Sequence, residues 1–340
     1  MPHIFLLIFA LLLFASPATA SENPWTHTLY FENDMFTGSD SDYTNGIKYS
    51  IISPDLSPDA PRRKTAQIPR KVLDFFHKIP FIKNAAPETS HKVELALAQK
   101  MYTPRDISRS DLIRNDRPYA GYTYLATSFH RMSDLGGYLS QMDTAEVQLG
   151  IVGPASLAED AQKLVHRVRG LQRPNGWDNQ LKNEPGLALI FERKWLFHPR
   201  YDDAWCADAI LHSGAALGNV MTYANAGVEI RTGWNLPRSF SVSVIRPAGS
   251  VWNAELSGFT VYLFGAIDGR AVARDIFLDG NTFRSSHRVA KEYFVADLSI
   301  GLTLSYNRLT VSLIRNTRTR EFREQPGSHN FDSVVLSYAF

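Results

Sequence analysis

The last ten residues, 331–340, constrain the fold of this chain more than any other segment. Large apolar side chains alternate here with mostly small ones: the large set is Val334, Leu336, Tyr338 and Phe340, and the small set is Ser333, Val335, Ser337 and Ala339. Successive side chains of a β-strand point to opposite faces, so one face of this segment is apolar and the other is small. A final strand of this kind, ending on an aromatic residue, is more typical of a membrane β-barrel than of a sheet in a soluble protein.

The start of the sequence predicts export. Residues 4–14 form an almost unbroken apolar run, and Ala18-Thr19-Ala20 fits the small-x-small cleavage pattern. The run is shorter than the roughly 20 residues of a membrane-spanning helix. We therefore predict a signal peptide over residues 1–20 and one outer-membrane β-barrel domain over residues 21–340. Cys206 is the single cysteine, which excludes an intramolecular disulfide, and no strongly basic tract indicates a nucleic-acid partner.

Alternating segments recur along the whole mature chain, with turn residues between them. The predicted fold is all-β, a twelve-stranded antiparallel transmembrane β-barrel, and an even strand number is usual for single-chain bacterial barrels. Glu94, Glu146 and Glu229 fall in the middle of strands and are expected to face the lumen, because a carboxylate on the lipid face is costly. The predicted strands are 25–33, 43–52, 91–101, 120–131, 143–151, 186–197, 205–218, 223–234, 257–272, 289–304, 307–320 and 331–340.

Strand parity predicts where the loops lie. If both chain ends are periplasmic, the connections after the first, third and fifth strands all lie at the cell surface. These connections, roughly 34–43, 102–119 and 152–185, hold the densest unusual polar sequence of the chain. Functional residues are therefore expected at the outer rim.

The first outer connection brings together oxygen-rich residues. Glu32-Asn33-Asp34 ends the first strand and Tyr43-Thr44-Asn45-Gly46 begins the second, so the two stretches can face each other across a hairpin. Carboxylate, amide and carbonyl oxygens suit a hard cation such as Ca²⁺, and the Asp40-Ser41-Asp42 turn adds further oxygens. The alternative is an acidic surface hairpin in which Asn, Asp and Gly only serve the turn geometry.

The third outer connection predicts a short surface-loop helix. Ser156-Leu157-Ala158-Glu159 has the pattern of a capping box, and Gly170 stands at the expected C-terminal stop. An apolar stripe is expected to dock this helix against the barrel wall; it consists of Leu157, Ala161, Leu164, Val165 and Val168. His166 lies off the stripe and is a candidate general base for activating water. The alternative, which is the usual one for a lone histidine, is a solvated side chain on a helix face.

Other catalytic patterns receive less support. No Gly-x-Ser-x-Gly elbow is present, although a Ser/His pair built in space stays open. A single cysteine leaves no Cys/His zinc spacing. The second outer connection carries four arginines that either bind phosphates or form a solvated basic loop, namely Arg105, Arg109, Arg114 and Arg117.

Several motifs together resemble the outer-membrane lipid A 3′-O-deacylases. The resemblance covers most of the mature chain and lies in Glu32-Asn33-Asp34, Tyr43-Thr44-Asn45-Gly46, Met101-Tyr102-Thr103-Pro104, Asp116-Arg117-Pro118-Tyr119-Ala120-Gly121, residues 150–154, residues 162–166 and residues 176–185. It implies a twelve-stranded barrel whose active site lies between the wall and a surface-loop helix. It also implies Ca²⁺-dependent hydrolysis of the acyloxyacyl ester at the 3′ position of lipid A.

The resemblance also implies roles for single residues. His166 becomes the base that activates water, and Asn33, Asp34 and Thr44 match the other active-site positions, with Asp34 and Asn33 as the metal ligands. Gln172 stands where one member of the family has Glu, and a neutral amide cannot give a cation the same charge. We expect the His166 ring within about 10 Å of Asn33 and Asp34, close enough for one substrate carbonyl to reach both.

Three function classes stay open at this point. The favoured one is a lipid A deacylase that acts on lipopolysaccharide in the outer leaflet, with no protein partner implied. The second is a different outer-membrane lipid esterase, such as a phospholipase, which needs the same base and oxyanion support. The third is a non-enzymatic barrel or pore, for which the polar loops are only a solvated rim.

Overall fold

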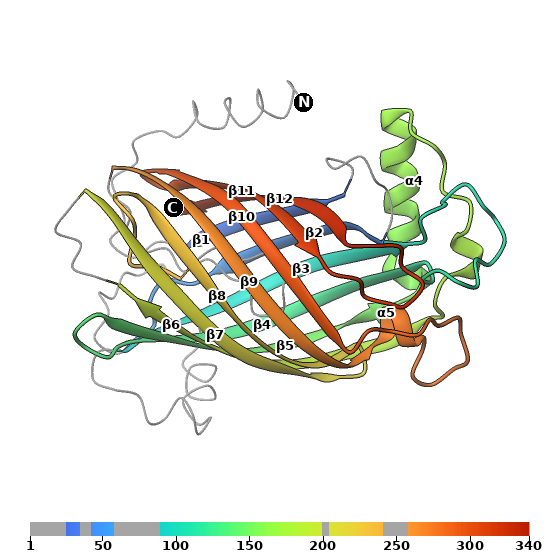
Figure 1. The fold of residues 1–340 in the computed structure, drawn as a ribbon, viewed down its shortest axis with the longest axis horizontal. Helices are drawn as coiled ribbons and strands as arrows, with labels where there is room; N and C mark the ends of the chain where they lie inside the picture. Colours follow the sequence, from blue (N-terminus) through green and yellow to red (C-terminus); the bar gives the residue numbers. More distant parts are fainter. Residues whose placement is uncertain (1–24, 35–41, 58–88, 199–203, 241–257, 340) are drawn as a thin grey trace.

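The computed structural model describes residues 25–34, 42–57, 89–198, 204–240 and 258–339. The predicted signal peptide and Phe340 lie outside this part and stay predictions. Twelve antiparallel strands close into one barrel, in which β1 pairs with both β2 and β12. Figure 1 shows the strands crossing the long axis of the barrel obliquely. None of the described helices is long and apolar enough to span a membrane.

All twelve predicted strands are present, most with ends within a few residues of those expected. The strands are β1 (Thr26–Asn33), β2 (Asp42–Ile52), β3 (Thr89–Thr103), β4 (Ala120–Asp134), β5 (Leu139–Val152), β6 (Glu184–Phe197), β7 (Trp205–Gly218), β8 (Met221–Trp234), β9 (Phe259–Asp275), β10 (Phe294–Tyr306), β11 (Leu309–Arg318) and β12 (His329–Ala339). The largest difference is the start of β10, expected at residue 289. Val289 and Glu292 instead donate their backbone N–H groups to the carbonyls of Leu278 and Glu321, so the regular ladder with β9 begins only at Phe294.

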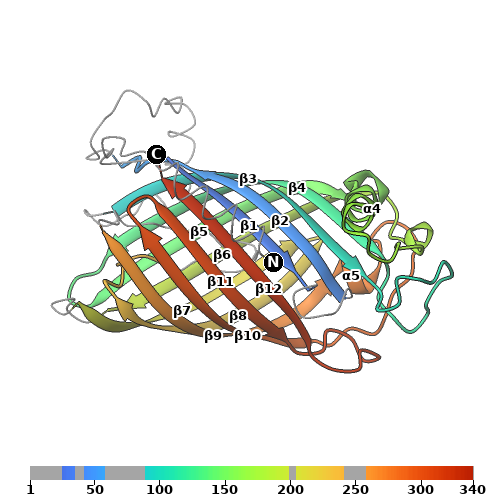
Figure 2. The same cartoon turned by 90° about the horizontal axis from the view of Figure 1, so that it is seen from above.

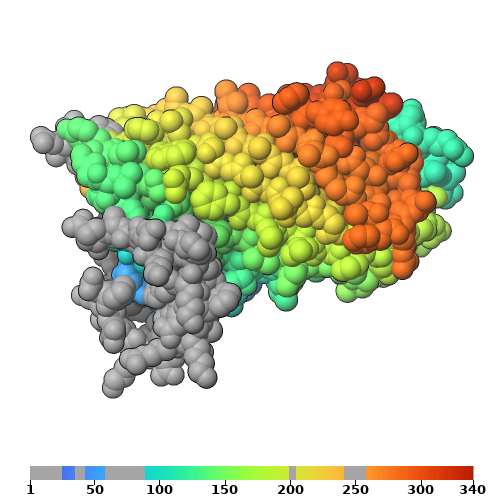
Figure 3. Space-filling view, turned by 90° about the horizontal axis from the view of Figure 1, so that it is seen from below, coloured from blue at the N-terminus to red at the C-terminus, as the bar shows by residue number. Residues whose placement is uncertain are grey.

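Side-chain burial alternates along the strands and distinguishes the two faces of the wall, as predicted. On β12, Ser333, Val335 and Ser337 are buried, whereas the intervening Val334 and Leu336 are partly exposed. Leucines on the other face of β3 to β5 are exposed, as a lipid-facing belt requires; they include Leu95, Leu97, Leu125 and Leu149. In Figure 3 the residues coloured yellow to orange cover one side of the barrel.

Charged pairs fill the lumen. Lys48 Nζ lies 2.9 Å from Glu94, and His130 Nε2 lies 3.1 Å from the other oxygen of the same carboxylate. Glu146 accepts a hydrogen bond from Ser128 at 2.9 Å. The prediction that Glu94 and Glu146 face the lumen is therefore confirmed. These long side chains are almost fully buried, and such filling of the interior argues against an open pore.

One end of the barrel carries the described helices. These are α4 (Ala158–Arg169), which follows β5, and the single-turn α5 (Ile276–Asp279), which follows β9. Figures 1 and 2 show both at the end opposite to the C-terminus of β12. The connections after odd-numbered strands thus share one rim, as parity predicted. That rim positions the candidate site.

The buried ion pair between Lys48 and Glu94 generates a stability prediction. Glu94→Ala leaves the buried Lys48 ammonium without its nearest carboxylate, so we expect a loss of about 3–5 kcal/mol in the free energy of unfolding. The measurement is urea unfolding of the purified barrel in detergent, followed by tryptophan fluorescence. The double variant Lys48→Met/Glu94→Leu removes both charges and should lose much less. An unchanged urea midpoint for Glu94→Ala would contradict the pairing.

Candidate active site

The ends of β1 and β2 bring three of the predicted site residues together. Asn33 pairs with Asn45 in the β1–β2 ladder, whereas the β2–β3 ladder jumps from Tyr43 to Asn45. Thr44 is thus the extra residue of a β-bulge, a feature that re-aims a strand at a sheet edge. Its carbonyl accepts the Asn33 side-chain amide at 3.2 Å and the Asp34 backbone N–H at 3.4 Å. The Thr44 carbonyl therefore binds both Asn33 and Asp34.

This group lies on the outside of the barrel wall. Glu32, one residue before Asn33, points into the lumen, where its carboxylate accepts the Tyr43 hydroxyl at 2.6 Å. Asn33 consequently faces outward. Thr44 does the same, since its hydroxyl lies 2.6 Å from that of Thr103, which shares a face with the exposed Leu97. Even so, Asn33 and Thr44 are buried, and Asp34 is 0% exposed.

The 3₁₀ turn that leads into α4, Pro154–Ser156, is fixed to the outer wall of β3 and β4. Gln99 Nε2 and Thr123 Oγ1 both donate to the Ser156 carbonyl, at 2.8 and 2.7 Å. Gly121 leaves the room for this contact, because an added Cβ would lie 2.1 Å from Ser156 Oγ and 2.3 Å from Ala158 Cβ. The predicted capping box is wrong. Ser156 ends a 3₁₀ turn, and Leu157, in a left-handed conformation with φ 60°, precedes the helix without a side-chain cap.

The inner face of α4 packs on the loops of the same rim. Ala158 belongs to a buried cluster with Met101, Ile107, Tyr119 and Trp177. Gln162 accepts the Trp177 indole N–H at 2.8 Å. This face of α4 is therefore the buried one, and it carries both apolar and polar side chains.

The predicted docking of the apolar stripe is wrong. Leu157, Leu164, Val165 and Val168 are exposed, and Ala161 alone of the stripe packs on the buried cluster. The buried residues of α4 are Ala158, Gln162 and His166. The hydrogen bonds of Gln162 and His166 determine which side of the helix faces the barrel.

His166 is held by a main-chain contact. Its Nδ1 lies 2.5 Å from the Gln172 carbonyl, and the side chain is 3% exposed. A carbonyl can only accept, so Nδ1 carries the proton in this bond and a neutral ring has its lone pair on Nε2. That tautomer is the one a general base needs. The predicted stop at Gly170 is confirmed, and its φ of 66° turns the chain so that residue 172 reaches the ring.

Gln172 contacts His166 through its backbone carbonyl. The difference between Gln and Glu at this position concerns only the side chain, and no motif signals a carbonyl contact. The nearest available signal was Gly170, because a left-handed C-cap predicts a sharp reversal immediately after the histidine.

Strand register relates α4 to the group at the bulge. Asn33 pairs with Asn45, Asn45 with Met101 and Met101 with Gly121, which abuts the start of α4. All predicted site residues thus belong to the outer rim between β1 and β4 or to the helix attached to it. The distance of less than about 10 Å from the His166 ring to Asn33 and Asp34 stays a prediction.

The four arginines of the second connection separate into two kinds. Arg105, Arg109 and Arg114 are exposed, and Arg109 pairs with Asp111. Arg117 is fully buried and lies 3.1 Å from Glu321. Burial would raise the pKa of Glu321, but Arg117 and Arg318 outweigh it and hold this pKa below its ordinary value. Arg117 is therefore part of an internal ion pair and not of a solvated loop.

The predicted cation site stays a prediction. Among the described residues, no group of three or more His, Cys, Asp or Glu side chains is placed to hold a metal ion. Asp34 has a buried carboxylate, and the preceding residue, Asn33, carries an amide whose Nδ2 donates to the Thr44 carbonyl. Carboxylate and amide oxygens are ligands that Ca²⁺ prefers. Asp40 and Ser41, expected to add oxygens, lie outside the described residues.

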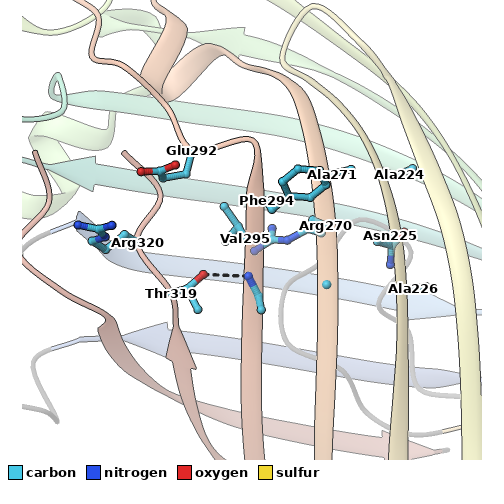
Figure 4. A pocket seen from close by; sticks show the side chains of 12 residues that line it. Ala224, Asn225, Ala226, Arg270, Ala271, Glu292, Phe294, Val295, Thr319 and Arg320 are labelled. Carbon is cyan, nitrogen blue, oxygen red and sulfur yellow. Dashed lines mark hydrogen bonds between the residues drawn. The ribbon is translucent and has the colours of Figure 1, made fainter. Parts of the chain in front are cut away.

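A hollow lies elsewhere on the wall, across β8, β9 and β10. It has a volume of ≈ 700 Å³, and small residues such as Ala224, Ala226 and Gly269 form much of its lining. Figure 4 shows Glu292, Phe294 and Arg320 around it. Glu292 contributes a carboxylate and Thr319 a hydroxyl to this lining, but none of the residues predicted for the site lies there.

Gly121 provides a test of how α4 is held. Gly121→Ala should push the start of α4 off the wall and weaken its docking by about 1–3 kcal/mol, because the added Cβ overlaps Ser156 and Ala158. Limited trypsin digestion of the folded protein should then cut faster after Arg167 or Arg169. Gly265→Ala is the matched control, since nothing lies within 4 Å of its added Cβ. Equal cleavage rates in both variants would refute the close contact.

A family model described as outer membrane protein LpxR matches residues 6–340. LpxR from Salmonella typhimurium is similar in structure, with a TM-score of 0.71 at 17% identity, over 93% of this chain and 100% of that chain. At that identity the likeness shows the fold. No curated protein sequence matches the chain.

Two further solved structures are less similar. The β domain of the Bordetella autotransporter Brka gives a TM-score of 0.45 at 8% identity, over 94% of this chain and 99% of that chain. The translocator domain of the autotransporter NalP from Neisseria meningitidis gives 0.39 at 8% identity, over 99% and 96%. Neither likeness is strong enough to carry an argument.

Proposed function

Since the chain belongs to the family of the outer membrane protein LpxR, we propose that it is a lipid A 3′-O-deacylase, a carboxylic ester hydrolase that removes the 3′-linked acyloxyacyl chain. The observation that carries the proposal is the position of the candidate residues. Asn33 and Thr44 lie on the outer, lipid-facing side of the wall, and the helix with His166 is attached to the same side. An enzyme acting on a membrane lipid needs its catalytic groups on that side, whereas a pore needs them in the lumen.

His166 acts as the general base. Its Nδ1–H bond to the Gln172 carbonyl directs the basic Nε2 toward the reacting water. Water loses a proton to Nε2 while its oxygen attacks the ester carbonyl carbon. The acyl–oxygen bond then breaks, the sugar oxygen takes the proton, and the acyloxyacyl chain leaves as a carboxylic acid.

Asp34 and Asn33 hold the cation in this proposal. Ca²⁺ bound there supplies positive charge to polarise the ester carbonyl and stabilise the developing oxyanion. Thr44 orients the pair, because its carbonyl binds both the Asn33 amide and the Asp34 backbone. Its hydroxyl bond to Thr103 ties this bulge to β3.

The rim that bears α4 faces the cell surface in this proposal, where lipid A occupies the outer leaflet. The exposed arginines of the second connection, Arg105 and Arg114, suit a phosphorylated head group there. A phospholipase would use the same base and oxyanion support. Mass spectrometry of lipid A and phospholipids from cells with and without the protein separates these substrates, and a change confined to phospholipids would overturn the proposal.

The role of His166 is tested by substitution. His166→Ala should lower the rate of 3′-acyloxyacyl release by about 10²–10⁴-fold, the usual effect of losing a general base. The assay uses purified protein and lipid A in detergent, with heat-modifiable migration as the check on folding. Gln172→Ala is the matched control and should keep near-normal activity, because it retains the carbonyl that binds His166. Full activity in His166→Ala would remove this residue from the mechanism.

The cation is tested separately. Asp34→Asn keeps the size of the side chain but removes its charge, so Ca²⁺ affinity should fall and the rate should drop by about 10²-fold or more. Calorimetric titration of Ca²⁺ into the folded protein measures the affinity without any reaction. Asp111→Asn is the control, because this exposed carboxylate pairs with Arg109. Activity that survives chelation would exclude the cation.

A further inference from the structure

The surface of α4 is divided into three sides. One side, with Ala158, Gln162 and His166, is buried. At 100° per residue, the apolar side lies next to it in one direction around the helix, and the polar side lies next to it in the other. The apolar side consists of Leu157, Leu164, Val165 and Val168, which are 61%, 56%, 46% and 77% exposed. The polar side consists of Asp160, Lys163 and Arg167.

The height of α4 coincides with the end of the lipid-facing belt. On β3 the exposed Leu95 and Leu97 belong to the belt. The next outward residue, Gln99, already binds Ser156 in the turn that leads into α4. On β4 the same step leads from the exposed Leu125 to Thr123. Two residues along a strand span about 7 Å, so this turn and the helix that follows it begin directly above the apolar belt.

The direction of α4 is that of a helix lying along a membrane surface. Figure 1 shows the helix from its side and Figure 2 shows it end-on, although the long axis of the barrel is horizontal in both. The helix axis therefore crosses the barrel axis. Figure 1 also shows α4 extending past the outline of the barrel.

We propose that the apolar side of α4 is inserted among the acyl chains of the outer leaflet, so that this helix lies in the membrane interface. An exposed apolar side that continues a lipid-facing belt meets an apolar medium when it turns toward the bilayer. The polar side then faces the water and the head groups. Insertion needs no substrate and no reaction, so it goes beyond the proposed function and can hold or fail independently of it.

The experiment measures the depth of nitroxide spin labels on α4. Single cysteines replace Val168 and Leu164 on the apolar side and Arg167 and Asp160 on the polar side, all in a Cys206→Ser background. Leu97→Cys is the reference for the lipid belt. The labelled proteins are reconstituted into vesicles of palmitoyl-oleoyl-phosphatidylcholine. Electron paramagnetic resonance then compares collisions with oxygen, which enters the bilayer, and with a water-soluble nickel chelate.

Insertion predicts a several-fold higher ratio of oxygen to nickel accessibility at Val168 and Leu164 than at Arg167 and Asp160, close to the ratio at Leu97. Equal, nickel-accessible signals on both sides would show that α4 stands in water and would overturn the proposal. Labels on the apolar side that neither reagent reaches would show a second copy or another protein segment covering it, which overturns the proposal as well. Heat-modifiable migration confirms that each variant is folded.

Discussion

Pairing between β1 and β12 is the constraint on which the rest of this structure depends. In a bilayer no water satisfies an unpaired strand edge, so a sheet crosses it only as a closed barrel. Thr26 pairs with Ala339 and Asn33 with Asp332, which joins the two ends of the sheet over the whole length of β1. Closure gives every residue of the wall one of two environments, lipid or lumen.

That division explains how neighbouring residues serve different purposes. Glu32 faces the lumen and accepts the Tyr43 hydroxyl, while Asn33 faces outward and binds the bulged Thr44. In the lumen, the charged groups neutralise one another in pairs such as Lys48 with Glu94. Asn33 and Thr44 instead lie at the rim on the lipid side of the wall, where a lipid head group lies in the proposed reaction.

Much of the fold was predictable from the sequence because alternation is a local signal. All twelve strands, the lumen position of Glu94 and the rim shared by the odd connections follow from period two and parity. The pairing of the ends of β1 and β2 was also predictable, since a hairpin brings its own ends together. The bulge at Thr44 was not, because nothing in the residue types distinguishes it from a regular pair.

The helix shows where sequence reasoning failed and why. An apolar stripe is expected to pack on protein because water is the usual alternative, but a helix at a membrane has a second apolar medium beside it. The burial of Gln162 and His166 depends on Trp177 and on the Gln172 carbonyl, and both partners lie outside the helix. Arg117 was grouped with its loop neighbours although its partner, Glu321, is 204 residues away.

The contact between His166 and the Gln172 carbonyl also bears on which changes this site tolerates. A main-chain oxygen is the same in every residue type, so the ring is oriented by the length and shape of the turn that starts at Gly170. Inserting or deleting one residue between positions 170 and 172 would move a different carbonyl toward Nδ1. The length of this turn is therefore much more constrained than its residue types. In relatives of this chain, the number of residues between the histidine and the carbonyl matters more than residue identity.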